Sequence, residues 1–584
     1  MKTSWTLPGL CFFAAVVGLT VAGFSAEKTV VVAPSLVKAL PAETVLLVRV
    51  QNISELARKW KESPFYKLKD KAEFAPLMQQ LEEGWNEFKG HAQKELKIDL
   101  AQLLGACKGE VAFVLGNLTA VADAIGKSLS TGEEPDVKLD TIPLLVSLDT
   151  LEGKADFAKN LKQLFDQGRK SGVKVKEEDF RGGKVVTVSR PEDAGDDGPE
   201  HIYFGEHGTR YFISLSPDFL KQTIANLGSG ATSSLDQVAN FQATQKQTGG
   251  GGDFFMYLNV RSFVEAVDKS IEASMFGFIW QRLRQLLVGE SLNNLGVSAN
   301  LEKEGLRSKM FLHNGGGADG LLGWFKTPAV AAKPSPLIPA EALSFSTMGI
   351  NAEQVATALW EVGKTAMMMM GGGADFESQF QQQFGVSLQD IFRSLGSRFH
   401  TFTSKGPSGT NPMGDLSIIL ELKDDNPLKQ LLDKAGPMLA GAATQSTYLN
   451  RDVFSFATGM PDLAPTFTVT DRYLIFSLAQ ANVEKVIRRI GKSTSELGES
   501  AGFKKFSALL PPKVAGLSYS DEKYLNTVLE NLADSIRQQG SDDVPEWFFQ
   551  IFAVGGRLFG SSGSYLLWKD QGLYSESWAP FRAE

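Results

Sequence analysis

The segment LPAETVLLVRV at Leu40–Val50 decides the fold, because a second version of it, LIPAEALSFSTMGI, stands at Leu337–Ile350. Both versions place a run of apolar residues directly after a proline turn, and such a run is typical of a strand that is covered on both faces. Three further segments of the first half return in the second half in the same order: Ile98–Gly105 as Val386–Gly396, Ile142–Leu161 as Asp415–Leu432, and Arg210–Gly228 as Arg472–Gly491. Matches that keep their order indicate two tandem copies of one domain.

This repeat divides the 584 residues more surely than length alone does. We expect a signal peptide over residues 1–26, a first repeat domain over 27–314, a Gly/Pro-rich linker over 315–338 and a second repeat domain over 339–584. The linker is predicted from GGGADG and PSPLIP, two stretches rich in the residues that interrupt helices and strands.

Each copy predicts the same succession of strands, helices and hairpins. One β-hairpin turns at Glu206–Gly208 and its counterpart at Thr470–Arg472, and the helix after each stops at a glycine, Gly228 or Gly491. The last hairpin of each copy turns at EKEG or KDQG. This mixture predicts an α+β fold, with two tandem copies of a mostly antiparallel sheet domain whose helices pack on one face.

The N-terminus has the layout of an export signal. Lys2 is the sole charge in the first 26 residues, and the apolar stretch Leu10–Phe24 is followed by small residues. We therefore expect a cleaved signal peptide and a periplasmic or secreted protein. The alternative is an N-terminal membrane anchor, since Leu7–Phe24 is just long enough to span a bilayer, but Pro8 interrupts this stretch and no basic cluster follows it.

Composition excludes several classes of protein. With 67 acidic and 59 basic residues the formal net charge is −8, which gives the chain no electrostatic reason to bind nucleic acid. A mean hydropathy of −0.10 excludes a membrane protein with many spans. Cys107 is the one cysteine outside the signal segment, so the mature chain has no intramolecular disulfide, and we interpret Cys107 as a small buried residue rather than a reactive thiol.

No motif for catalysis, a cofactor or a metal appears in the chain. GKS at Gly126–Ser128 and at Gly491–Ser493 lacks the earlier glycine of a phosphate-binding loop, and the acidic loop Pro191–Glu200 lacks the alternate spacing of a calcium loop. The five histidines form neither HExxH nor a pair four residues apart: His91, His201, His207, His313 and His400. We therefore assign no catalytic, cofactor-binding or metal residues and expect no cofactor.

Three motifs stand near the start of the first copy: LPAET at Leu40–Thr44, SPFYKL at Ser63–Leu68, and IDLAQLLGACKGEVA at Ile98–Ala112. Together they resemble the pattern of a family of exported bacterial proteins known as a domain of unknown function. The second copy keeps the pattern at Pro339–Glu341 and lacks the SPFY element. The resemblance implies export and the fold; it implies no catalytic residue.

These observations favour a non-enzymatic envelope protein with a binding or scaffold role over an enzyme. Its partner would be an unknown protein or a hydrophobic ligand, with no nucleic acid, and it would touch the membrane through the signal segment before cleavage. Two alternatives remain. An extracytoplasmic hydrolase predicts a deep pocket with two carboxylates within about 10 Å of each other. A carrier of lipids or other hydrophobic ligands predicts an apolar cavity, which the 39 phenylalanines permit.

Overall fold

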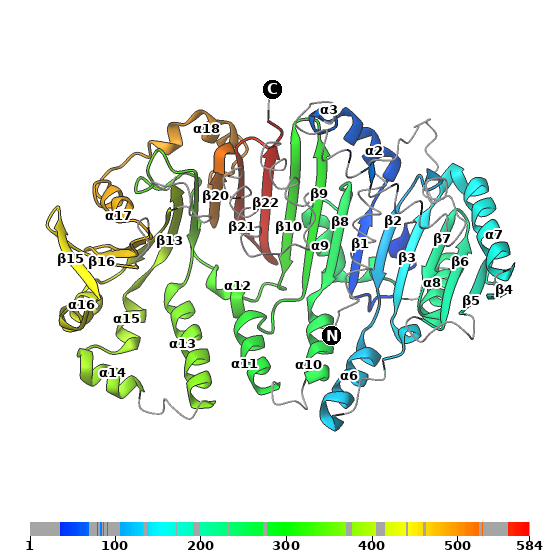
Figure 1. Cartoon of the computed structure of the whole chain (residues 1–584), viewed down its shortest axis with the longest axis horizontal. Coiled ribbons are helices and arrows are strands. Elements are labelled where there is room, and N and C mark those ends of the chain that lie inside the picture. Colours follow the sequence, from blue (N-terminus) through cyan, green and yellow to red (C-terminus); the bar gives the residue numbers. More distant parts are fainter. Residues whose placement is uncertain are drawn as a thin grey trace. The chain divides into compact units, whose positions relative to one another are not determined.

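The structure of the protein, a computed structural model, describes most of the chain (Figure 1), namely residues 35–68, 105–132, 137–170, 172–190, 199–229, 233–271, 277–369, 376–404, 415–439, 442–458, 463–524 and 559–582, with the single positions 79, 82, 83, 86, 90 and 528. The predicted signal peptide, His91 and most of the acidic loop at 191–200 lie outside the described residues. The chain divides into two compact units, unit 1 with residues 1–281 and 292–315, and unit 2 with residues 282–291 and 316–584.

The sheet of unit 1 is antiparallel at every pairing. Starting from β4, neighbours follow the order β4 (Lys174–Phe180), β5 (Gly183–Ser189), β6 (His201–His207), β7 (Arg210–Ser214), β3 (Leu144–Asp149), β2 (Val111–Leu115), β1 (Leu46–Val50), β8 (Phe254–Asn259), β9 (Asn294–Glu302) and β10 (Gly305–His313).

The sheet of unit 2 is also antiparallel, and its strands follow the same order of connection. Neighbours run β15 (Ala443–Tyr448), β16 (Arg451–Phe456), β17 (Thr466–Val469), β18 (Tyr473–Ser477), β14 (Asp415–Leu422), β13 (Leu395–Ser404), β12 (Ser344–Gly349), β20 (Gly516–Ser520), β21 (Ser562–Lys569) and β22 (Gly572–Pro580). The predicted α+β class is confirmed. The shared order supports a duplicated domain, which stays a prediction.

Helices cover both faces of the strands in unit 1, whereas the sequence placed them on one face. Leu145 of β3 packs in one apolar cluster with helices on its side of the sheet, and Leu148 packs in a second cluster on the opposite side. Because side chains alternate along a strand, apolar residues at both parities create two surfaces to be buried. The first surface is covered by two short 3-10 helices, η1 (Leu36–Lys38) and η4 (Leu235–Gln237), and by the α-helices α8 (Pro217–Ser229) and α9 (Ala239–Thr248). The second surface is covered by α2 (Ile53–Glu62) and α7 (Lys154–Lys170).

Unit 2 repeats this two-sided arrangement. Ile419 of β14 belongs to a cluster with α17 (Gln480–Ile487), η5 (Leu497–Glu499) and α18 (Ala501–Ser507). Leu422 of the same strand belongs to a cluster with α14 (Phe376–Phe384), α15 (Leu388–Ser394) and α16 (Asn426–Leu439).

The remaining described helices of the two units are α3 (Pro64–Leu68), α6 (Thr119–Thr131), η2 (Leu139–Thr141), η3 (Leu151–Gly153), α10 (Val260–Ile271), α11 (Gly277–Leu287), α12 (Gly320–Trp324) and α13 (Ala352–Met369).

The segment predicted as a linker, residues 315–338, carries regular structure. It contains α12 and the short strand β11 (Val330–Ala331), which pairs with β19 (Lys513–Val514), and both strands belong to unit 2. The predicted hairpins are confirmed, since β6 pairs with β7, β17 with β18, β9 with β10 and β21 with β22.

A tyrosine opposite a glycine sets how closely α9 approaches the sheet in unit 1. Tyr257 of β8 pairs with Gly296 of β9, and Phe241 of α9 meets the tyrosine ring edge-on at 4.9 Å between centroids. A Cβ atom added at Gly296 would lie 2.2 Å from Cγ2 of Thr244, also on α9. The glycine therefore provides the space in which the helix rests.

Unit 2 has the same arrangement beneath α18. Tyr519 of β20 pairs with Gly563 of β21, and Phe503 of α18 meets the tyrosine ring edge-on at 5.5 Å. A Cβ atom added at Gly563 would lie 2.4 Å from the ring of Phe506. The two units thus share a packing detail as well as a strand order.

Candidate functional site

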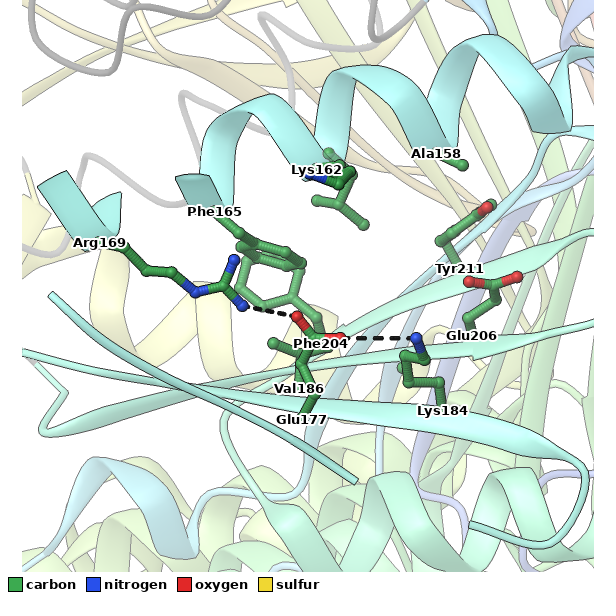
Figure 2. Close-up of a pocket in the computed structure, with 12 residues that line it drawn as sticks. Ala158, Lys162, Phe165, Arg169, Glu177, Lys184, Val186, Phe204, Glu206 and Tyr211 are labelled. Carbon is green, nitrogen blue, oxygen red and sulfur yellow. Dashed lines mark hydrogen bonds and ion pairs between the residues drawn. The ribbon is translucent and has the colours of Figure 1, made fainter. Parts of the chain in front are cut away.

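A cleft of about 260 Å³ lies between helix α7 and strands β4 to β7 of unit 1 (Figure 2). Its helix wall consists of side chains spaced three or four residues apart, which places them on one side of α7. Its sheet wall consists of residues from neighbouring strands, with Val186 of β5 directly opposite Phe204 of β6. The apolar lining is Ala158, Leu161, Phe165, Val186, Phe204 and Tyr211.

Aromatic rings form the walls of this cleft. Phe165 and Phe204 meet edge-to-face with ring centroids 5.1 Å apart, and Phe157 packs beside Tyr211 at 4.4 Å. The Tyr211 hydroxyl is buried and has no hydrogen-bond partner among the described residues. Burial, with a smaller contribution from Glu206, raises the pKa of Tyr211 to about 12, so the hydroxyl stays protonated. An unsatisfied donor of this kind costs stability that a suitable acceptor would restore.

Charged side chains surround the cleft and pair with one another. Glu177 accepts hydrogen bonds from Arg169 at 2.6 Å and from Lys184 at 3.5 Å, and both appear as dashed lines in Figure 2. Lys154 lies 3.0 Å from Glu206. The hydrogen bond from Arg169 lowers the pKa of Glu177, so this carboxylate is ionised at neutral pH.

The hydrolase alternative requires two carboxylates in one pocket, and Glu177 and Glu206 both line this cleft. A general acid needs a raised pKa so that it carries a proton at neutral pH. The pKa of Glu177 is shifted in the opposite direction by its ion pairs. Glu177 is therefore unsuited to the acid role, and the hydrolase hypothesis stays a prediction.

A second cavity, of about 290 Å³, lies in unit 2 beside β12, β13, β14 and β18. Buried polar side chains stand on its sheet side: the exposed fraction is 5% for Thr347 and 4% for His400, and Thr347 Oγ1 lies 3.0 Å from His400 Nδ1. Burial is the main cause, and the charge of Arg398 the smaller one, that lowers the pKa of His400 to about 4. The His400 ring is therefore neutral at neutral pH.

Charged residues of the strands and residues of two connecting segments also line this second cavity. Arg398 of β13 and Glu421 of β14 line it, with Nη1 and Oε1 3.8 Å apart, and so does Tyr473 of β18. Residues from the segment 330–337 and from the turn after α17, including Lys492, also line it. Three cationic side chains and one carboxylate thus line the cavity: Lys333, Arg398, Lys492 and Glu421.

The corresponding place in unit 1 holds a buried ion-pair network. Glu110 lies 3.3 Å from Arg49 and 2.9 Å from Arg210, and Arg210 lies 3.4 Å from Asp149. All four side chains are at most 8% exposed. Arg49 also donates to the Gly250 carbonyl at 2.7 Å. Each charge therefore has opposite charges or hydrogen-bond partners, as buried charges require.

Strand register establishes which positions correspond. The shared PAE motif aligns Arg49 with Thr347, and these residues pair across to Ala112 and His400 respectively. Two residues before Ala112 and His400 stand Glu110 and Arg398. Across the next strands Asp149 pairs with Arg210, and Glu421 pairs with Tyr473. The four network positions of unit 1 are thus occupied in unit 2 by Thr347, Arg398, Glu421 and Tyr473.

Residues that the sequence singled out are scattered. Gly126 of the first GKS lies inside α6, where an added Cβ atom would lie 2.6 Å from the Lys269 carbonyl oxygen of α10, so it serves helix packing. Gly491 of the second GKS follows α17 with a φ of +92°. Cys107 is fully buried, and burial raises the pKa of its thiol to about 12, in agreement with the buried interpretation.

Four of the histidines lie on strands, in both units: His201 and His207 on β6, His313 on β10 and His400 on β13. Within the described part of the chain, no three His, Cys, Asp or Glu side chains are grouped so as to hold a metal ion. The spacing of the histidines did not mark His400 as part of a site, and no sequence pattern singled out Arg398 or Tyr211. The buried ion-pair network of unit 1 did have a sequence signal. Its four charged residues stand in or beside apolar strands, where a charge usually has a partner: Arg49, Glu110, Asp149 and Arg210.

In the ranges that the structure describes, no helix is long and apolar enough to cross a membrane. No family model and no curated protein matches the chain. A crystal structure of the protein TP0453, crystal form I, is similar to 44% of this chain over 81% of its own length, with 6% sequence identity and a TM-score of 0.22. Similarity at that level carries no argument about function. The resemblance to a family of exported proteins stays a prediction.

Proposed function

We propose that this chain is a non-enzymatic binding protein of the cell envelope, and that the α7 cleft of unit 1 holds an apolar group of its ligand. The observation that carries the proposal is the unpartnered hydroxyl of Tyr211 among the apolar side chains of a cleft whose other lining residues are charged. Ligand sites are commonly apolar with a small number of placed polar groups. A ligand with a hydrogen-bond acceptor behind its apolar group would satisfy this donor after a small shift of the ring. The envelope location rests on the predicted signal peptide.

The size of the cleft limits the ligand. Its volume of about 260 Å³ falls just below the range of roughly 300–1,000 Å³ that drug-sized ligands occupy. This favours a single ring or a short hydrocarbon chain over a whole membrane lipid. The charged side chains of Glu177, Arg169 and Lys184 at the cleft would meet the polar end of such a ligand.

A residue of unit 2 indicates which substitution would fill the α7 cleft of unit 1. The strand registers place Phe454 of β16, which pairs with Phe467, where unit 1 has Val186, which pairs with Phe204. The ring of Phe454 stacks on Phe467 at 5.2 Å between centroids. Val186→Phe therefore introduces into unit 1 a side chain that the same scaffold accommodates in unit 2, and Ala158→Phe fills the cleft from the helix side.

The test is native mass spectrometry of the mature protein purified from its own envelope. We expect a small-molecule adduct on the native chain and on the control Ala155→Phe, which adds the same ring at an exposed position of α7. The adduct should be lost from Val186→Phe and from Ala158→Phe, while circular dichroism confirms that each variant folds. Absence of an adduct from the native chain, or its persistence in both cleft variants, would contradict the proposal.

A further inference from the structure

We infer that the cavity of unit 2 is a second binding site, for a small oxyanion that carries a carboxylate or phosphate group, with the guanidinium of Arg398 as its principal partner. This site differs in position and chemistry from the α7 cleft, and it does not depend on the function proposed for that cleft.

Arg398 has donor capacity that the protein does not use. Its contact with Glu421 measures 3.8 Å, longer than a hydrogen bond, and none of its guanidinium N–H groups donates to a residue that the structure describes. A guanidinium offers five N–H groups in a planar fork that matches carboxylate and phosphate oxygens. Because Arg398 lines a cavity, a ligand oxyanion can reach these donors.

The charges around the cavity favour an anion although the whole chain is acidic. Lys333 and Lys492 line it with Arg398, against the single carboxylate of Glu421. Lys492 is 3.0 Å from Glu496, whereas Lys333 forms no ion pair with any described residue. Cationic side chains that surround a concave site raise the local concentration of anions.

Neutral polar groups next to Arg398 complete the recognition surface. Thr347 and His400 are almost fully buried and are bonded to each other through Oγ1 and Nδ1, so the His400 ring has a fixed position. Tyr473 adds a phenol to the lining. Hydroxyl and imidazole groups of this kind hydrogen-bond to ligand oxygens without requiring a further charge in the site.

Unit 1 shows how the same scaffold holds a carboxylate at this place. There Glu110 lies between Arg49 and Arg210, at 3.3 and 2.9 Å. In unit 2 the position of Glu110 carries Arg398, and the positions of the two arginines carry Thr347 and Tyr473. The internal carboxylate is thus replaced by a cation and a cavity, so that an anion from outside the chain would restore the pairing that unit 1 makes internally.

Isothermal titration calorimetry of the full mature chain with inorganic phosphate and with citrate tests this inference and separates phosphate from carboxylate recognition. We expect at least one anion to bind, and Arg398→Gln to weaken its affinity roughly tenfold or more, because charged hydrogen bonds are lost. Arg398→Lys should weaken it less, since it keeps the charge without the fork. Glu421→Gln should strengthen binding by removing the competing carboxylate.

Two controls make the result specific. Lys505→Gln removes an exposed cation of α18 that does not line the cavity, and it should leave the affinity unchanged. Val186→Phe blocks the α7 cleft and should also leave anion binding unchanged, so failure of the cleft proposal and failure of this one are distinguishable. Binding of neither anion at millimolar concentration, equal affinities for the native chain and Arg398→Gln, or an equal loss in Lys505→Gln would overturn the inference.

Discussion

Units 1 and 2 share one order of strands, yet they are hollow in different places. Where unit 1 buries four charged side chains against one another, unit 2 has a cavity of about 290 Å³. Where unit 1 has a cleft beside Val186, unit 2 has the larger Phe454 stacked on Phe467. The arrangement of strands therefore does not determine where a ligand can enter. Side-chain volume and charge at equivalent positions determine it, which is why function must be argued from the site rather than from the fold.

The largest expected difference between the units concerns the buried network. Arg210→Met leaves Asp149 without its arginine and Glu110 with one of its two, so we expect a loss of about 3–5 kcal/mol in the free energy of unfolding. At the corresponding region of unit 2, Arg398→Met removes a half-exposed cation with a long ion pair, and the loss should stay below about 1 kcal/mol. Urea denaturation followed by fluorescence measures both. Equal losses of unfolding free energy in Arg210→Met and Arg398→Met would contradict this difference between the units.

A second difference lies in the response to pH. His400 has no counterpart that titrates, since unit 1 has Ala112 at that position. Its pKa is about 4 in the folded chain against 6.5 ordinarily, so the unfolded state binds more protons between these values. Stability contributed by neutral His400 is therefore present above pH 6.5 and is lost as the pH falls toward 4, by roughly 3 kcal/mol in all.

The variant His400→Gln, which cannot titrate, isolates this contribution. The difference in unfolding free energy between pH 7.5 and pH 5 should be smaller in the variant than in the native chain, because the other histidines are common to both. If the two chains lost stability equally over this range, His400 would have to be accessible to protons in the folded state.

A third prediction concerns the feature that the units share. Gly296→Ala and Gly563→Ala each force a methyl group against a helix that rests on the sheet, and each should cost about 1–3 kcal/mol. The effect should be larger at Gly563, where the obstacle is the ring of Phe506 rather than a threonine methyl group. Gly436→Ala in α16, with open space around it, is the control and should not destabilise the chain. Melting temperatures report all three.

The smallest effect is expected at the mouth of the α7 cleft. Glu177→Gln removes ion pairs with Arg169 and Lys184, whose side chains are 40% and 47% exposed, so the unfolding free energy should fall by less than about 1 kcal/mol. The same variant also tests the proposed ligand contact, because the amount of adduct in native mass spectrometry should change although the unfolding free energy hardly does. A loss of several kcal/mol in the same urea titration would mean that these charges hold α7 on the sheet.

The sequence by itself determined the local elements of this protein. The apolar run at Leu46–Val50 forms β1, and the hairpin around Glu206–Gly208 forms β6 and β7, because alternation and turn residues act over a few neighbouring positions. The α+β class followed from the same signals. The ordered repeat of segments also made two similar halves an expectation, and the common strand order of the two units agrees with it.

Only the tertiary structure decided how distant strands pair and what lies between them. β1 lies between β2 and β8, a strand about two hundred positions later in the chain, and this pairing brings Arg49 over the ring of Phe255 at 5.3 Å. Glu110 and Arg210 meet for the same reason. Such contacts depend on long-range packing that no local pattern specifies, so the network of unit 1, the cavity of unit 2 and the helices on both faces were beyond the sequence.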